Sequence, residues 1–521
     1  MQFKIDLTCI SKLMSNLKIL VLTGVLSLNG APVLAATYYV ATNGNDSYSG
    51  TSSQPFRTPQ KAANIASPGD TVLLRAGTYP PFTVSRSGLS GAPITFKNYP
   101  GESPLIRDDS SQSQSNTVQT VQIYQAQWIV IDGIRVSRGE NGVLLYSGAS
   151  NNTIMNCEVS DSWESGILVY GNSHNNLVKN CKVYNTNQVN WPRGSAQKNG
   201  QSWGAGLTCG DRSNGNIFED NYVYWNHGEG LSATNGCNGT IMRRNVVADN
   251  WSVNLYVDAS TNTTVDSNFV YLSTDGKNWN QIVSGMANKS NALGIGLSVE
   301  AYGNSTASLN GLKLTNNIVV NANGGVFAFQ PELSTPYTGW TVDNNTLVKN
   351  DVGIRIENAG SSIANNTFRN NIILQNAGGN AFYMNPSGAN TLRNNLYFGT
   401  AQLFAWGTST RDFAGWSSLS GEANSRWSDP KLENSSAILP RFWSDGSLPS
   451  ASPIVPLTNL ILGFRLTTIS PAIDAGVSVS TFNTDILGTS RSQGNSWDIG
   501  AHELVIGSST TVPVSNLRIL P

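Results

Sequence analysis

Short apolar runs recur along the chain with a period of 24 residues, most clearly between positions 216 and 258. Asn221 and Asn245 are 24 positions apart, and so are Gly230 and Asn254. Each unit holds three short β-type runs, which is too short for two helices and too long for one hairpin. Such a unit cannot bury its apolar face alone and must stack on its neighbours. The pattern therefore predicts an all-β solenoid of about 24 residues per coil.

One position of the repeat is mostly Asn. Asn side chains stacked one strand spacing apart, about 4.8 Å, can hydrogen-bond each other up the stack. The sequence therefore predicts an interior Asn ladder in which Cys157 and Cys181 are small, buriable substitutes. Two buried thiols are favoured there, with a disulfide between them as the alternative. The ladder positions are Gly133, Cys157, Cys181, Asn221, Asn245, Asn268, Asn317, Asn345, Asn371 and Asn395.

A second register contains Gly or Asn followed by apolar residues at positions +1 and +3. Strand periodicity turns those residues inward and positions +2 and +4 outward, which predicts one continuous sheet with a patterned outer face. Its first residues are Gly142, Gly166, Gly206, Gly230, Asn254, Gly296, Gly325 and Gly353.

Two long insertions, at about 184–205 and 272–295, fall in the turn that leads into this sheet. Insertions on one edge of a solenoid often mark its binding face. Exposed Trp side chains beside a groove can stack on the apolar faces of sugar rings, although some of these Trp residues would instead pack the loops onto the barrel. Six Trp lie in these turns: Trp163, Trp191, Trp203, Trp225, Trp251 and Trp279.

The ends of the chain differ from the repeat. Residues 1–35 combine lysines, an apolar run and a Val-Leu-Ala cleavage pattern, so we expect a signal peptide and a secreted protein, extracellular or periplasmic. An uncleaved N-terminal anchor is the alternative. Residues 36–127 are expected to form an N-terminal cap and the first coils, with Thr58 as the N-cap of a short helix. Regular coils follow at 128–400, closing coils or a cap at 401–505 and a flexible tail at 506–521.

The amino-acid composition excludes some classes of binding partner. The chain has 521 residues, 12% of them charged, and a formal net charge of −1. This balance gives no global attraction to nucleic acid or to anionic membranes, and no integral membrane segment is expected after signal cleavage. We expect a monomer with a polysaccharide partner.

Two segments resemble a known family. The opening YYVATNGNDSYSGT…PFRTPQKAANIASPGDTVLLRAGTY is similar to the N-terminal segment of family 9 polysaccharide lyases, and the ending SPAIDAG…DILG…R…DIGAHE is similar to the tail of many bacterial relatives. The resemblance implies a right-handed parallel β-helix of the pectate-lyase-like superfamily, whose patterned sheet lines the substrate groove. The family's Asp-rich calcium run is absent from this sequence, so no catalytic residue carries over by motif.

Asp258 and Glu300 form the best candidate pair. Their assignment to the same outward position on successive coils predicts carboxylates on the order of 5 Å apart. Retaining glycosidases place their two carboxyl groups at about this distance, and crowding raises the pKa of one of them, as a general acid requires. The same pair could instead hold Ca²⁺ or simply be solvated beside Arg355.

Further candidates lie in the turns. Glu229 and His227, in WNHGEG, are acid/base candidates at the groove edge; the alternative is a solvated turn His. Arg193 and Lys198 in the first insertion could serve β-elimination as cation or base. Expected substrate contacts are Trp203, Trp225, Trp251, Tyr256, Trp279 and Arg355.

The sequence therefore predicts a carbohydrate-active β-helix protein that binds and cleaves an extended polysaccharide, as a lyase or a glycoside hydrolase. A non-catalytic surface or matrix polysaccharide-binding protein and a polysaccharide epimerase are the alternatives.

Overall fold

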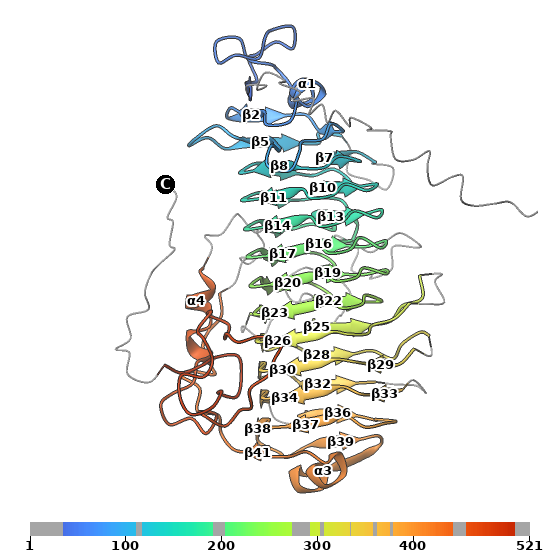
Figure 1. Cartoon of the computed structure of the whole chain (residues 1–521), viewed down its shortest axis with the longest axis vertical. Coiled ribbons are helices and arrows are strands. Elements are labelled where there is room, and N and C mark those ends of the chain that lie inside the picture. The colour runs from blue at the N-terminus through green and yellow to red at the C-terminus, as the bar shows by residue number, and fades with distance from the viewer. Residues whose placement is uncertain are drawn as a thin grey trace, which may run out of the picture. The chain divides into compact units, whose positions relative to one another are not determined.

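The computed structural model describes residues 35–110, 117–190, 204–273, 292–302, 307–333, 335–357, 362–375, 379–440 and 455–505. The described residues from Ala36 onward belong to one compact unit. Its coils build three sheets of 13 strands each, and successive coils pair in parallel (Figure 1). The solenoid predicted from the 24-residue period is confirmed.

The three sheets are called A, B and C. Sheet A contains β1 (Thr37–Val40), β2 (Thr71–Leu74), β5 (Ile94–Asn98), β8 (Ile129–Asp132), β11 (Thr153–Met155), β14 (Leu177–Lys179), β17 (Ile217–Glu219), β20 (Ile241–Arg243), β23 (Thr264–Asp266), β26 (Lys313–Thr315), β30 (Thr341–Asp343), β34 (Thr367–Arg369) and β37 (Thr391–Arg393). Sheet B contains β3 (Gly77–Tyr79), β6 (Pro104–Arg107), β9 (Arg135–Ser137), β12 (Glu158–Ser160), β15 (Lys182–Tyr184), β18 (Tyr222–Tyr224), β21 (Val246–Ala248), β24 (Phe269–Tyr271), β27 (Ile318–Val320), β31 (Thr346–Val348), β35 (Ile372–Leu374), β38 (Leu396–Phe398) and β41 (Arg426–Trp427). Sheet C contains β4 (Phe82–Val84), β7 (Gln119–Tyr124), β10 (Asn141–Tyr146), β13 (Ile167–Tyr170), β16 (Ala205–Cys209), β19 (Glu229–Ala233), β22 (Val253–Asp258), β25 (Leu293–Ser298), β28 (Gly324–Ala328), β32 (Val352–Ile356), β36 (Phe382–Met384), β39 (Phe404–Trp406) and, antiparallel to it, β40 (Ser409–Arg411). A small pair joins β29 (Tyr337–Thr338) and β33 (Ile363–Ala364).

Helices lie at both ends of the coil stack. Helix α1 (Pro59–Ile65) begins at Thr58, whose Oγ1 accepts a hydrogen bond from the backbone N–H of Lys61, as the sequence predicts. Its buried alanines belong to the core. At the other end, α3 (Phe413–Ser420) places Trp416 against Phe404 with ring centroids 5.3 Å apart. Both ends of the apolar interior are therefore covered. Further helices in the described ranges are η2 (Gln188–Asn190), α4 (Leu457–Leu460) and η3 (Leu462–Phe464).

Paired asparagines make the turn between sheets A and B. In Asn316-Asn317, the first residue has a φ of 56°, in the left-handed region that Asn tolerates better than most residues. The second is buried, and its Nδ2 donates 3.0 Å to Oδ1 of Asn345 in the next coil. The pattern repeats up the stack, so the predicted ladder is confirmed from Asn221 to Asn395.

The 24-residue pattern did not predict two further Asn ladders. One joins Asn152, Asn176 and Asn216. The other runs through Asn226 and Asn250 to Asn254, and all these side chains are buried. Cys157, Cys181, Cys209 and Cys237 are buried free thiols, as favoured from the sequence.

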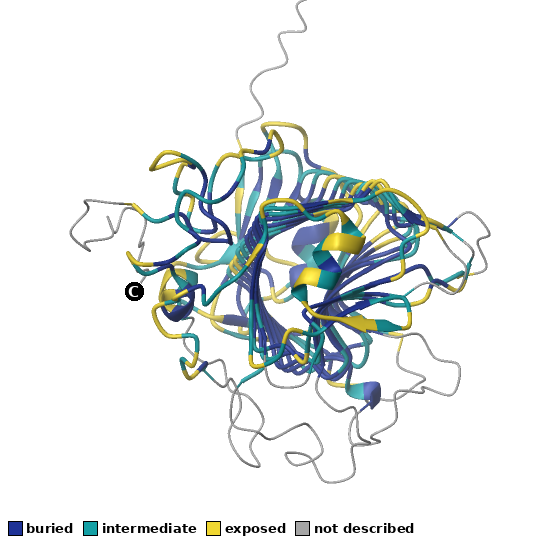
Figure 2. Cartoon of the chain, turned by 90° about the horizontal axis from the view of Figure 1, so that it is seen from below, coloured by how far each residue is buried: buried dark blue, intermediate teal, exposed yellow. Residues whose placement is uncertain are grey.

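Viewed along the stack, buried residues line the inside of the coils (Figure 2). A second buried cluster lies outside sheet B, where the chain after β41 folds back along the coils (Figure 1). Leu460 and Phe464 pack there with aromatic residues of sheet B, and the hydroxyl of Tyr271 donates 3.0 Å to the carbonyl of Pro440. The region 401–505, expected to close the far end, therefore closes it only through its first part. The rest, the chain after β41, packs on the outer side of sheet B and is called the flank segment.

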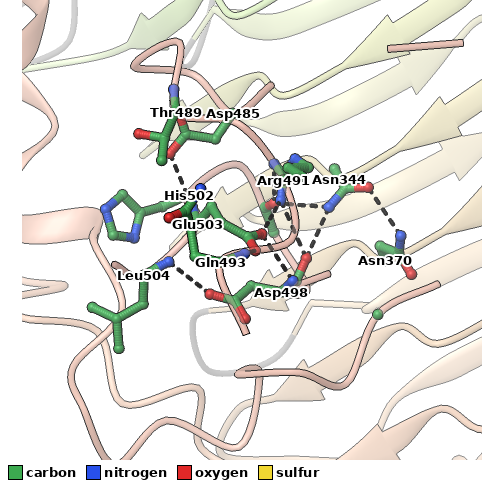
Figure 3. Close-up of polar contacts among 12 residues, drawn as sticks. Asn344, Asn370, Asp485, Thr489, Arg491, Gln493, Asp498, His502, Glu503 and Leu504 are labelled. Atoms are coloured by element: carbon green, nitrogen blue, oxygen red, sulfur yellow. Dashed lines mark hydrogen bonds and ion pairs between the residues drawn. The ribbon is translucent and has the colours of Figure 1, made fainter. Parts of the chain in front are cut away.

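A buried polar network fixes this flank segment (Figure 3). Arg491 donates to Oε2 of Glu503 at 3.1 Å, to the carbonyl of Gly500 and, across to the solenoid, to Oδ1 of Asn316 at 2.7 Å. Oδ2 of Asp485 accepts from the backbone N–H of Glu503. The terminal motif DILG…R…DIGAHE therefore holds the segment against the coils through buried polar contacts.

No helix in the described ranges is long and apolar enough to cross a membrane. Residues 1–34, which contain nearly all of the expected signal peptide, lie outside those ranges, as does the expected tail at 506–521.

Candidate functional site

The outer face of sheet C carries a groove of about 830 Å³. Both long insertions enter this sheet, one before β16 and one before β25, as the sequence predicts. The groove is lined by Glu140, Asn141, Glu164, Ser165, Leu168, Tyr170, Ala205, Thr208, Gly210, Glu229, Ser232, Thr234, Asn235, Ser252, Val253, Tyr256, Ser298, Glu300, Tyr302, Phe329, Gln330 and Glu332.

The register of the central strands differs from the sequence assignment by two residues. Asp258 pairs laterally with Ser298, not with Glu300, and Tyr256 pairs with Gly296. The sequence Gly294-Ile295-Gly296 offers two glycines, and Gly294 takes the repeat position. A Cβ on Gly294 would lie 2.3 Å from Cγ1 of Val319, the same kind of approach that Gly166 makes to a valine of sheet B. The predicted inward and outward faces survive, because a shift of two residues preserves strand parity.

Asp258 and Glu300 are nevertheless in direct contact. Glu300 follows the end of β25, and its backbone N–H donates 2.9 Å to Oδ1 of Asp258. The hydroxyl of Tyr256 donates 2.9 Å to Oε1 of Glu300. Glu300 faces the groove, whereas Asp258 is fully buried beneath it. Glu300 is therefore open to a polymer in the groove, whereas Asp258 lies beneath the groove lining.

The surroundings of Asp258 keep its carboxyl group neutral up to about neutral pH. Burial first, and the nearby charge of Glu300 second, raise the pKa of Asp258 to about 7, while the hydroxyl of Tyr302 and the N–H of Glu300 act in the opposite direction. Oδ2 of Asp258 is buried and has no hydrogen-bond partner among the described residues. A perturbed carboxyl group in a groove wall is typical of functional sites.

More glutamates line the groove than the sequence reasoning identified. Glu332 accepts a 3.0 Å hydrogen bond from the backbone N–H of Ala301, next to Glu300. Near the opposite end, Oε2 of Glu140 accepts 2.5 Å from Gln119. Burial raises the pKa of Glu140, against the effect of Gln119 and with a further contribution from Glu164. The sequence contains a signal for this second pair, because Glu140 and Glu164 are 24 residues apart, which is one period of the repeat.

All charged side chains in the described lining are acidic. It contains five glutamates, among them Glu229 at the start of β19, and no Lys or Arg. Arg193 and Lys198 lie outside the described residues. Arg355 points outward from β32 as expected, but it pairs with Glu357 at 2.5 Å, stacks on Tyr383 and is absent from the described groove lining. The described groove surface is therefore anionic.

The structure does not support the expectations for His227. This residue is fully buried rather than solvated in a turn, and its Nε2 lies 2.9 Å from Oδ1 of Asn185. Burial lowers the pKa of His227 to about 3, so the ring is neutral at physiological pH. Because its turn packs under the neighbouring coil, His227 cannot reach the groove as an acid/base group.

For two residues, the prediction that they stack on sugar rings is wrong because their side chains are buried. Trp225 and Trp251 are 3% and 1% exposed and belong to the cluster outside sheet B. This burial leaves no face of either ring for a sugar. Trp203 and Trp279 lie outside the described residues. Tyr256 does line the groove, although the residue is only 5% exposed.

Asp258 and Glu300 are the residues predicted to hold calcium. Ca²⁺ takes about six to eight oxygen ligands, so most would have to come from water, backbone carbonyls or substrate. No group of three or more His, Cys, Asp or Glu side chains in the described part of the chain is arranged to hold a metal ion.

A sequence model described as "Pel9A-like, right handed beta helix region" matches residues 38–318. The chain belongs to this family. The handedness and the resemblance expected from the terminal motifs are thereby confirmed.

Similarity to individual relatives is local in sequence. The chain is 37% identical over 99 residues to the uncharacterized protein YwoF of Bacillus subtilis strain 168, covering 19% of this chain and 21% of that protein. It is 40% identical over 77 residues to pectate lyase PEL9 of Emericella nidulans, covering 14% and 19%. The matches thus span about a fifth of these curated relatives. The structure of pectate lyase Pel9A matches with a TM-score of 0.54 at 20% identity, covering 90% of this chain and 96% of that one, which shows a shared fold.

Proposed function

We propose that the groove on sheet C binds an extended polysaccharide and cleaves it by acid–base chemistry at carboxyl groups. The observation that carries this proposal is the contact between the groove-facing Glu300 and the buried Asp258, whose pKa is raised by burial first and by the nearby charge of Glu300 second. Family membership places the chain among β-helix proteins related to carbohydrate-active enzymes.

Glu300 is the proposed catalytic residue that touches substrate. Its carboxyl group is oriented by the hydroxyl of Tyr256, and that of Glu332 is oriented by the N–H of Ala301. Two fixed carboxyl groups on one groove wall can divide the roles of general acid and general base around a glycosidic bond. Asp258 is a positioning residue, because it is buried and acts through Glu300.

The described lining favours hydrolysis of a neutral or amino-sugar polymer. β-Elimination from a uronate requires a base and a cation that neutralises the sugar carboxylate, and repulsion from five glutamates would oppose a polyanion. The relatives named as pectate lyases favour elimination as the second candidate, with the cation supplied by a metal ion or by residues outside the described ranges.

Cellulose, chitosan and polygalacturonate would be incubated with the protein, and both new reducing ends and the ultraviolet absorbance of unsaturated products would be measured. Hydrolysis predicts reducing ends without that absorbance. Glu300→Gln and Glu332→Gln should each lower the rate by about 10²–10⁴-fold, the usual contribution of a general acid or base. Glu433→Gln, at an exposed carboxyl group outside the groove, is the matched control. Polymer binding without products would instead support a non-catalytic binder.

We also propose that the protein acts outside the cytoplasm, on the basis of the signal-like residues 1–35. The N-terminal sequence of protein recovered from culture medium or periplasm would test this, with Ala36 expected as the first residue.

A further inference from the structure

Three tyrosines from successive coils stand in one column on the outer face of sheet C. Tyr124, Tyr146 and Tyr170 end β7, β10 and β13, and the strand register pairs each with the next. They are 36%, 38% and 36% exposed, although most large hydrophobic side chains of the coils are buried. Ring centroids are 6.2 Å apart in the first pair and 6.4 Å in the second. The result is a continuous aromatic stripe.

This column leads directly to the carboxyl cluster. Continuing the register from Tyr170 gives Gly210, Thr234 and then Asp258. Tyr170 already lines the groove. It lies three strand spacings from Asp258, or about 14 Å along the stack, and Tyr124 lies five spacings away, or about 24 Å. The stripe and the groove therefore form one surface.

Glycines keep the rings of this column in place. A Cβ on Gly171 would lie 2.7 Å from the ring of Tyr146, and a Cβ on Gly210 would lie 3.2 Å from the ring of Tyr170. Gly171 also has a φ of +66°, which most side chains disfavour. Each of these rings thus rests against backbone of the next coil.

Sheet stability alone does not require this exposure. Cross-strand aromatic pairs contribute only about 0.2–1 kcal/mol each, and apolar residues of the inner face already pack these coils. The hydroxyl groups of Tyr124 and Tyr146 have no hydrogen-bond partner among the described residues, so they are available to a ligand. An amphipathic ring with a free hydroxyl group suits a sugar, which has apolar ring faces and hydroxyl edges.

We propose that Tyr124, Tyr146 and Tyr170 form binding subsites for the polysaccharide chain that extends from the carboxyl cluster toward the N-terminal coils. This inference rests on the proposed function, because it names where the same polymer continues. It predicts that affinity grows with chain length until the stripe is filled.

Affinity electrophoresis in gels containing hydroxyethyl cellulose, glycol chitosan or polygalacturonate would measure binding by the full chain. Tyr124→Ala and Tyr146→Ala should each weaken binding several-fold, and the double variant should weaken it further. Tyr146→Phe keeps the ring and should retain most of the affinity. Tyr48→Ala removes an exposed tyrosine outside the column, so its binding should be unchanged. Thermal unfolding of each variant would verify that it is folded.

The two proposals fail in different ways. Unchanged binding by folded Tyr124→Ala/Tyr146→Ala, together with loss of cleavage in Glu300→Gln, would overturn the stripe and leave the proposed function intact. Absence of binding and cleavage by the wild type with all three polymers would overturn both. Weaker polymer binding with an unchanged cleavage rate on a disaccharide of the cleaved polymer would support the stripe.

Discussion

The backbone N–H of Glu300 donates a 2.9 Å hydrogen bond to Oδ1 of Asp258, and this contact joins two consecutive coils at the groove. It places a buried carboxyl group under an accessible one, with no described partner for its second oxygen. Burial and the charge of Glu300 raise the pKa of Asp258 to about 7. The site therefore lowers fold stability when Asp258 is ionised.

Ionisation of Asp258 predicts a dependence of fold stability on pH. Between pH 3.8 and about 7 the folded protein retains a proton on Asp258 that the unfolded chain has lost, so this group makes stability fall as pH rises through that window. Asp258→Asn should remove the loss and stabilise the protein by up to about 4 kcal/mol near pH 8, with little change near pH 4. Urea unfolding at both pH values measures it. Asp109→Asn, at an exposed carboxyl group, is the control. Equal shifts at both pH values for Asp258→Asn would contradict the assignment.

The second prediction concerns calcium. An ion at Asp258 and Glu300 would satisfy the unpartnered Oδ2, so calcium at about 100 times its Kd should stabilise the wild type by about 2.7 kcal/mol. Glu300→Gln should lose this response. Thermal unfolding with calcium and with EDTA measures it. A wild-type Tm that is the same in both solutions would rule out a stabilising calcium site.

The third prediction tests the Asn ladder. The amide of Asn245 donates to the carbonyl of Phe218 and to Asn268, and its Oδ1 accepts from Asn221. Asn245→Ala removes these buried hydrogen bonds and the bond from the backbone N–H of Asn221 to Oδ1 of Asn245, at about 1–3 kcal/mol for each buried group left without a partner. We expect a loss of at least about 3 kcal/mol in the free energy of unfolding.

Asn238→Ala, at an exposed Asn that accepts from neighbouring side chains at the coil surface, should cost about 0.5 kcal/mol or less. Similar losses at positions 238 and 245 would mean that the ladder contributes no more than a surface contact.

The fourth prediction concerns the flank segment. Arg491→Met leaves the carboxylate of Glu503 buried without its cation, which typically costs about 3–5 kcal/mol. Release of the segment should expose the aromatic cluster outside sheet B and increase binding of a hydrophobic dye. Arg411→Met, at an exposed arginine, should do neither. A stable Arg491→Met variant without dye binding would show that apolar packing alone holds the segment.

The sequence predicted the regular features of the coils because they repeat locally. Each Asn-Asn pair encodes a left-handed turn residue followed by a ladder residue, as in Asn316-Asn317. Inward and outward positions on sheet C followed from strand parity, which Leu255 and Val257 obey in full burial. These features depend on neighbours a few residues away and on one constant period.

Register and coverage required the tertiary structure. After the second insertion, Gly294 and Gly296 both fit the sequence pattern, and the structure places Gly294 at the repeat position, against Val319. Trp225 and Trp251 are buried in one cluster with Leu460 and Phe464, which lie more than 200 residues later in the chain. The periodic pattern predicts that a side chain points out of a coil. Whether solvent, a ligand or the chain's own distant end then meets that side chain is decided by long-range packing, which a local repeat does not encode.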